Sequence, residues 1–188
     1  MRRPILAGNW KMYKTAPETT EFIERFKPLV SKIDGCEIVV FPAAINIPAA
    51  IAAVGDSSVG IGGQNIYWGK EGAFTGEISA DMLRAAGAGW VLVGHSERRN
   101  TVCHETDADV LKKTQAALAA DLKPVVCVGE RLEEHKAGGA LPSSVRRADV
   151  DEVRRTELVE EAWAEASQTD EVKRNLEILK PVIERVGF

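Results

Sequence analysis

The sequence lacks any apolar run of the roughly 20 residues that a membrane-spanning helix needs. It also lacks an excess of positive charge, because 24 Lys and Arg residues stand against 28 Asp and Glu residues, with a formal net charge of −4. We therefore expect neither a membrane nor a nucleic acid as a partner. An anionic substrate needs a local pocket of positive charge, since the field of the whole chain does not attract it.

Cysteine is scarce as well. The three cysteines, Cys36, Cys103 and Cys127, have no paired spacing, which is typical of a reducing cytosol, and we interpret them as small buried apolar residues. Cys103 and His104 are adjacent and isolated, so their spacing does not suit zinc, and no glycine pattern matches a nucleotide motif. Residues 1–10 contain only a short apolar stretch and do not have the pattern of a signal peptide. We expect a cytoplasmic protein with no metal and no cofactor.

Five short apolar runs indicate buried parallel strands. They are rich in Val and Ile and continuous rather than alternating, as in strands covered on both faces. The runs are residues 4–9, 37–42, 58–65, 90–96 and 123–130. Helical stretches separate them, so strand and helix alternate five times, which predicts an α/β fold with right-handed crossovers.

Two of the intervening helices have clear signals. One begins near Thr15 with Pro17 in its opening turn. Its predicted buried side carries Phe22, Phe26 and Val30. The other covers residues 105–121, and its apolar stripe consists of Val110, Leu111, Ala117 and Leu118.

The pattern changes near residue 140. Residues 148–186 contain no glycine and no strand-like run, and their apolar residues recur at helical spacing, which predicts an α-helical hairpin. We divide the chain into a strand-helix segment, residues 1–138, and a C-terminal segment, residues 139–188, that belong to one compact domain.

Polar side chains follow the predicted strands, at the edge where parallel α/β folds bind their ligands. Asn9 and Lys11 come directly after the first strand, and a lysine at the floor of a pocket supplies positive charge for a phosphate or an oxyanion. His95 follows the fourth strand and suits a general acid, a general base or a neutral hydrogen-bond donor. Glu97 could pair with Lys11 or with an arginine. The alternatives are a solvated lysine at a strand end and a structural histidine.

The other polar features have two interpretations each. Arg98 and Arg99 either form salt bridges with loops or helices, or belong to a solvated run of charge. The loop at residues 67–79 places Phe74 between glycines, followed by Thr75. A protruding loop with an aromatic tip suggests docking into a partner surface, and a loop tucked against its own chain is the alternative.

Six motifs, taken together, resemble a known family. They are GNWKM, GQN, GAFTGEIS, VGHSERR, ETD and VCVGE, in this order along the chain. Their order and intervals resemble triosephosphate isomerases of the bacterial type over residues 1 to about 138. The resemblance implies the first five strand-helix units of a TIM (β/α) barrel, followed here by the predicted α-helical hairpin. It also implies that dihydroxyacetone phosphate and glyceraldehyde 3-phosphate interconvert through an enediolate, a step of glycolysis and gluconeogenesis.

The same resemblance implies a role for individual residues. Asn9 and Lys11 match residues that bind the substrate. His95 matches the electrophile that polarises the carbonyl and shuttles a proton, and Glu97 matches the carboxylate beside the lysine, so Lys11, His95 and Glu97 form the catalytic set. Thr75, directly after Phe74, matches the loop that reaches the neighbouring subunit's site. This implies a homodimer that needs neither a cofactor nor a metal.

The chain departs from the family at three places. Cys103 and His104 stand where the family usually has phenylalanine and glycine, and Tyr13 replaces a common asparagine. Beyond about residue 140 the family's lid segment, with its catalytic glutamate, and its late phosphate loop are absent. Glu160 keeps the spacing of that glutamate to a following tryptophan and alanine, but it lies in a charged helical pattern, and we interpret it as part of a helix.

Two hypotheses follow for the function. The first is a triosephosphate isomerase-type enzyme whose chain is shortened or rearranged after the fifth unit. The second is a non-catalytic or engineered partial barrel that assembles with a partner, because five strands do not close an eight-stranded barrel.

Overall fold

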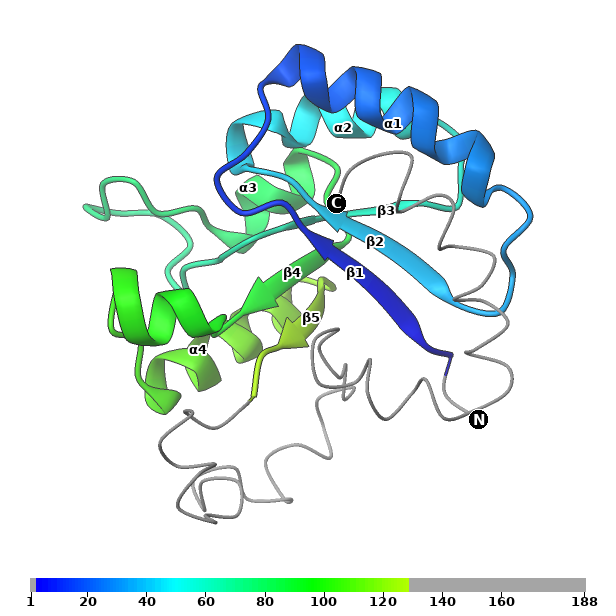
Figure 1. Cartoon of the computed structure of the whole chain (residues 1–188). Helices are drawn as coiled ribbons and strands as arrows, with labels where there is room; N and C mark the ends of the chain where they lie inside the picture. Colours follow the sequence, from blue (N-terminus) through cyan, green and yellow to red (C-terminus); the bar gives the residue numbers. More distant parts are fainter. Residues whose placement is uncertain (1–2, 129–188) are drawn as a thin grey trace.

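The computed structural model describes residues 3–128; the predicted helical hairpin and the division after residue 138 lie outside the described residues. Five strands form one parallel sheet in the order β1-β2-β3-β4-β5 (Figure 1). They are β1 (Ile5–Asn9), β2 (Glu37–Phe41), β3 (Gly60–Gly63), β4 (Trp90–Val93) and β5 (Lys123–Val126). The α/β class is confirmed, and the curled sheet with its helices is part of a TIM barrel.

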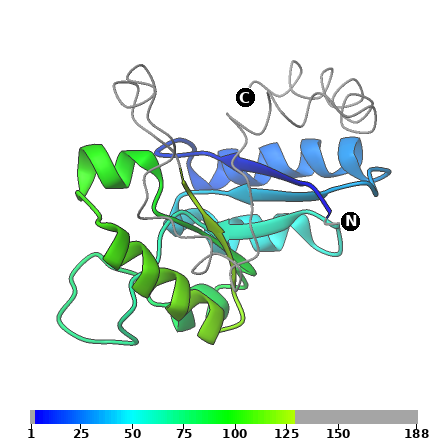
Figure 2. The ribbon, with the colours of Figure 1, turned by 90° about the horizontal axis from the view of Figure 1, so that it is seen from below.

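Helices connect the strands. They are α1 (Ala16–Val30), α2 (Ile47–Val54), α3 (Ala80–Ala85) and α4 (Asp107–Ala119), with a 3-10 turn η1 (Ala44–Asn46) before α2 and a π-helical turn η2 (Arg98–Val102) before α4. Helices α1 and α2 lie side by side, and α4 lies against β4 and β5 (Figures 1 and 2). Within residues 3–128, no helix has both the length and the apolar character that crossing a membrane requires.

Helix α1 begins where the sequence predicts. The backbone N–H and the hydroxyl of Thr15, the N-cap residue, both donate to the Glu18 carboxylate at 2.7 Å, so the N–H before the helix has a partner. These hydrogen bonds, from the backbone first, lower the pKa of Glu18. Phe22 and Phe26 are buried, as expected, and their rings stack with centroids 5.5 Å apart.

Successive strand residues point to opposite faces of the sheet, and both faces are buried. In β2, Ile38 and Val40 belong to the large cluster that the helices cover. Val39 and Phe41 belong to a second cluster, on the concave face, together with Trp90 and other residues from the strands. This explains why the strands are continuous apolar runs in the sequence.

The sheet is strongly curled. Strands β2 and β5 are three positions apart, which in a flat sheet separates them by roughly 14 Å. Nevertheless Lys123 Nζ lies 3.1 Å from Glu37 Oε2, and the lysine also lies over the Trp90 ring, 4.5 Å from its centroid. Because these side chains meet across the concave face, the sheet must bend between them.

Two glycines of β3 make room on the concave face. A Cβ atom added to Gly60 would lie 2.9 Å from Trp90 Nε1. One added to Gly62 would lie 2.6 Å from Phe41 Cδ1 and 2.8 Å from Trp90 Cβ. Aromatic side chains of the neighbouring strands β2 and β4 therefore occupy the space that side chains of β3 would need.

The apolar stripe predicted for α4 is wrong at two of its four residues. Val110 and Ala117 are buried, but Leu111 and Leu118 are 48% and 39% exposed. The buried face continues instead through Lys113 and Thr114, at three and four residues from Val110. Lys113 takes the central position because it is paired with a buried carboxylate, described below.

The interpretation of the cysteines is also corrected at one position. Cys36 and Cys127 are buried, and burial raises the pKa of Cys127 to about 12. Cys103 is exposed, because it follows the last residue of η2 at a point where the chain turns toward α4. All three thiols are free.

The close packing around β3 predicts that an alanine substitution costs more stability at Gly62 than at Gly89. Gly62→Ala should lower the free energy of unfolding by about 1–3 kcal/mol, because the methyl group overpacks the contact with Phe41 and Trp90. Gly89→Ala is the matched control, since no heavy atom lies within 4 Å of its added Cβ. Urea denaturation of both variants measures the difference, and equal stability of the two would contradict this account of the curl.

Candidate functional site

A cavity of about 580 Å³ lies at the carboxyl ends of the strands. Its polar lining comes from segments that are far apart in the sequence and includes Asn9, Lys11, Gln64, Asn65, His95, Glu97 and Arg98. All the strands run parallel, so these segments leave the sheet at the same edge. The residues that the sequence singled out after the first and fourth strands are thus in one place, together with Gln64 and Asn65 of the GQN motif.

Lys11 and Glu97 form an ion pair in this cavity. Nζ of Lys11 lies 3.1 Å from Oε1 of Glu97, and each side chain is about half exposed. The two residues follow β1 and β4, so the curl of the sheet brings them together. The pairing of Glu97 with Lys11, one of the two partners that the sequence suggested, is confirmed.

Asn9 shapes the backbone that carries the lysine. Its side-chain Oδ1 accepts a hydrogen bond from the backbone N–H of Lys11 at 2.9 Å. Lys11 itself has a φ of 52°, in the left-handed region that a side chain with a Cβ rarely adopts. The segment after β1 is therefore a specific, strained turn that leads into the cavity.

The ring of His95 is held by its own segment. The backbone N–H of Glu97 donates to Nδ1 of His95 at 3.3 Å. Oε2 of Glu97 lies 3.5 Å from the same nitrogen, but its charge is shared with Lys11. A neutral imidazole whose Nδ1 accepts a hydrogen bond carries its proton on Nε2. His95 is thereby arranged as a hydrogen-bond donor through Nε2.

Arg99 anchors the end of β4. Its Nε donates to the carbonyl of Gly94 at 2.6 Å, and Nη2 donates to the carbonyl of Cys127 at 3.3 Å. Nη1 lies 2.7 Å from Asp107 at the start of α4. Arg99 therefore joins the ends of β4 and β5 to the next helix. The prediction of a salt-bridging role is confirmed for this residue.

The prediction of a salt-bridging role is confirmed for Arg98 as well, and its partner Glu105 is shared with Lys113 in a buried network that the sequence did not indicate. Arg98 Nε and Lys113 Nζ each lie 2.5 Å from Oε1 of Glu105, whose side chain is only 5% exposed. Burial alone raises the pKa of Glu105, but the hydrogen bonds from Lys113 and Arg98 outweigh it, and the pKa stays below its ordinary value. Lys113 also donates to Oδ1 of Asn65 at 2.7 Å, so this network connects α4 with the floor of the cavity.

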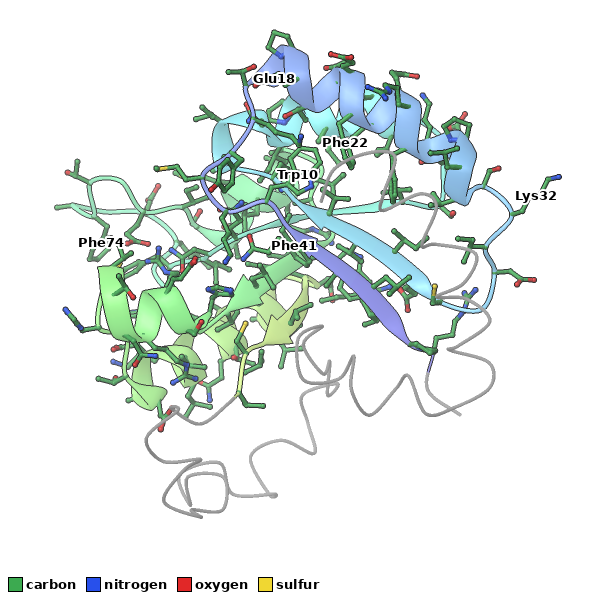
Figure 3. The ribbon with its side chains drawn as sticks, in the orientation of Figure 1. Trp10, Glu18, Phe22, Lys32, Phe41 and Phe74 are labelled. Carbon is green, nitrogen blue, oxygen red and sulfur yellow. The ribbon has the colours of Figure 1, made fainter. Side chains whose placement is uncertain are left out.

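The loop at residues 67–79 protrudes from the body of the molecule, with Phe74 near its outer part (Figures 1 and 3). The backbone N–H of Tyr67 donates to the carbonyl of Ile78 at 2.8 Å, which closes the base of the loop. Phe74 packs on Tyr67, with ring centroids 4.4 Å apart, and is still 44% exposed. The loop is thus both internally packed and outward-facing.

Large apolar side chains are exposed near the mouth of the cavity. Met12 is 94% exposed, and Tyr13 and Val102 also line the cavity while remaining largely open to solvent. Ile45, in η1 directly after the cavity-lining Ala44, is 86% exposed. Exposed apolar residues gathered in this way are typical of a protein–protein contact.

A second cavity, of about 400 Å³, lies at the amino ends of the strands. Its charged lining includes Arg3, Glu37 and Lys123, and the last two are paired with each other. Ligands of parallel α/β folds bind at the opposite end, so this cavity is not our candidate site. Within residues 3–128, no group of three or more His, Cys, Asp and Glu side chains is placed to hold a metal ion.

Comparison with known proteins agrees with the motifs. The model of the family described as triosephosphate isomerase matches residues 4–163, a range that includes Glu160, which lies outside the described residues. The triosephosphate isomerase of Solibacter usitatus is 55% identical over 138 residues, which cover 73% of this chain and 55% of that protein. The triosephosphate isomerase of Trichlorobacter lovleyi is 41% identical over 172 residues, 87% of this chain and 68% of that protein.

A solved structure shows the same fold. The crystal structure of triosephosphate isomerase from Bartonella henselae superposes with a TM-score of 0.68 at 42% identity, covering 73% of this chain and 56% of that chain. The chain spans about half the length of most of the curated relatives reported for it. On the strength of the family match and these relatives, the chain belongs to the triosephosphate isomerase family.

Proposed function

We propose that this chain interconverts dihydroxyacetone phosphate and glyceraldehyde 3-phosphate through an enediolate. The observation that carries the proposal is the arrangement of Lys11, Glu97 and His95 around one cavity at the carboxyl ends of the strands. The site combines a fixed ammonium group with an imidazole whose Nδ1 accepts a hydrogen bond, which leaves Nε2 as its donor. An anionic carbonyl substrate needs both groups.

The geometry supports a division of roles. The net charge of the chain is −4, so the ammonium group of Lys11 supplies the local positive charge for the phosphorylated substrate. When a carbon-bound proton is removed beside the carbonyl, negative charge develops on the carbonyl oxygen, and Nε2–H of His95 donates a hydrogen bond there. The same ring then passes a proton between the two oxygens of the enediolate. The proton returned to the neighbouring carbon completes the isomerisation.

Glu97 and Asn9 support these groups. Glu97 is engaged with Lys11 through its carboxylate and with His95 through its backbone N–H, so its role is to orient both. Asn9 orients the lysine backbone. Neither residue removes the carbon-bound proton, and the family's lid glutamate is absent. Glu160, which keeps the spacing of that glutamate to a following tryptophan, is the candidate base that the assay below tests.

A second candidate function rests on the edges of the sheet. β1 and β5 are the edge strands of the sheet within the described residues. Edge strands offer unpaired backbone groups to another chain. The alternative is therefore a partial barrel that assembles with a partner that supplies further strands.

Turnover by the purified chain separates these functions. We expect isomerase activity that falls by about 10²–10⁴ in His95→Gln, because the variant loses the proton-transferring ring. A coupled assay that consumes the aldehyde product measures it. His104→Gln is the matched control, since His104 is exposed and does not line the cavity.

The outcomes of this assay are distinct. Activity that depends on His95 and falls again in Glu160→Gln identifies Glu160 as the base. Activity that is indifferent to Glu160→Gln shows that another group acts as the base. Absence of turnover favours the partial barrel, and turnover unaffected by His95→Gln would contradict the proposed mechanism.

We also propose that two copies of the chain form a homodimer through the loop at residues 67–79. The exposed Phe74 and the following Thr75 lie on this protruding loop (Figure 3), and Met12 and Ile45 are further exposed apolar side chains. Such a patch is stabilised when a second copy buries it.

A cytoplasmic location, supported by the three free cysteines, completes the proposal and is testable by cell fractionation.

The dimer is tested by light scattering of the eluting protein. We expect a mass of about twice the 20.4 kDa chain, and a shift toward the single chain in Thr75→Arg, which places a charge in the contact. Leu118→Arg is the control, because Leu118 is an exposed apolar residue on α4. A chain that is monomeric throughout, or a dimer that Thr75→Arg leaves intact, would rule out this interface.

A further inference from the structure

Lys11 adopts a backbone conformation that its own side chain disfavours. Its φ of 52° places Cβ close to the following carbonyl, a contact that glycine avoids. A residue held in this region is retained only where the surrounding structure enforces it, and such residues gather at functional sites. At Lys11 a neighbouring side chain must therefore hold the backbone in this conformation.

Gln64 is placed to do so. Its Nε2 donates to the carbonyl of Lys11 at 2.8 Å and to the carbonyl of Phe41, also at 2.8 Å. Both hydrogens of the amide are thus used, and they join the turn after β1 to the end of β2. On the other side of the same turn, Asn9 accepts from the N–H of Lys11 at 2.9 Å.

The two hydrogen bonds of Gln64 differ in how much they restrain the turn after β1. The carbonyl of Phe41 also accepts a hydrogen bond from the backbone N–H of Trp10 at 3.1 Å, so it stays satisfied without Gln64. The bond to Lys11 acts on the strained residue itself. We expect loss of this bond to let the turn relax toward an ordinary φ and to move the side chain away from Glu97.

We propose that Gln64 is a positioning residue, which holds Lys11 in its strained turn so that Nζ stays at 3.1 Å from Glu97 and faces the substrate in the cavity. The part that concerns the substrate rests on the proposed function. The part that concerns the placement of Lys11 does not. Gln64 acts on the ligand only through the lysine.

The placement of Lys11 is tested by its reactivity. Under limiting acetic anhydride, the ion pair with Glu97 protects the amine of Lys11, and Lys32 serves as an exposed internal reference that projects into solvent (Figure 3). In Gln64→Leu we expect the Lys11-to-Lys32 acetylation ratio, read by mass spectrometry of peptides, to rise about threefold, since exposed ion pairs have this strength. Gln115→Leu, on the exposed side of α4, is the matched control. Gln64→Glu, which also lacks the amide donor, replaces Gln64→Leu if the latter does not fold.

Binding of dihydroxyacetone phosphate provides the second measurement. We expect Gln64→Leu to weaken binding about tenfold when Lys11 is present. In the Lys11→Gly background we expect the same substitution to leave binding unchanged, because Gln64 then has no ammonium group to position. An equal loss in both backgrounds, or an unchanged acetylation ratio in both Gln64 variants, would overturn the positioning role. If the unsubstituted chain does not bind this ligand, the proposed function fails, and the acetylation ratio still decides the role of Gln64.

Discussion

The curl of the sheet across β3 is the constraint on which the site depends. Lys11 follows β1 and Glu97 follows β4, three strands apart, and in a flat sheet these strands would be separated by roughly 14 Å. The ion pair at 3.1 Å forms only because the sheet bends, and the pair of Glu37 and Lys123 shows the same bend at the opposite end of the strands. Gly60 and Gly62 permit the bend because Trp90 and Phe41 occupy the space that larger side chains at these positions would fill. The packing of aromatic side chains against the glycines of β3 therefore determines how close the charged groups at the strand ends come to each other.

The charges around the cavity are arranged in two levels. At the solvent side, Lys11 and Glu97 are half exposed, so their pair is weak in energy but sets the position of an ammonium group. Beneath them, Lys113 and Arg98 share the buried carboxylate of Glu105, and losing either partner would leave charge unbalanced in the interior. The lower level connects the end of β3 with η2 and α4, whereas the upper level lines the cavity. The buried pairs and the half-exposed pair therefore lie in different layers of the molecule.

The sequence predicted the architecture well because its signals are local or repeated. The continuous apolar runs, the start of α1 at Thr15 and the polar residues after the strands all follow from spacing alone. The stripe of α4 failed at Leu111 and Leu118 because Lys113 is buried, and the charge that makes its burial possible belongs to Glu105, eight residues away. The two hydrogen bonds of Gln64 were also out of reach, since they depend on the bend of the sheet and on the φ of Lys11. The position of Lys113 between Val110 and Ala117, on the predicted buried face, is the signal from which a buried ion pair could have been predicted.

The tautomer of His95 is the most direct test of the central claim, that the strand ends form a site for a carbonyl substrate. Nitrogen NMR of the labelled ring at about pH 8, where an unperturbed imidazole is neutral, distinguishes a proton on Nε2 from one on Nδ1. The account predicts a proton on Nε2, because Nδ1 accepts from the backbone N–H of Glu97, and a shift of the Nε2 resonance when dihydroxyacetone phosphate is added. A proton on Nδ1, or an Nε2 resonance indifferent to saturating ligand, would contradict it.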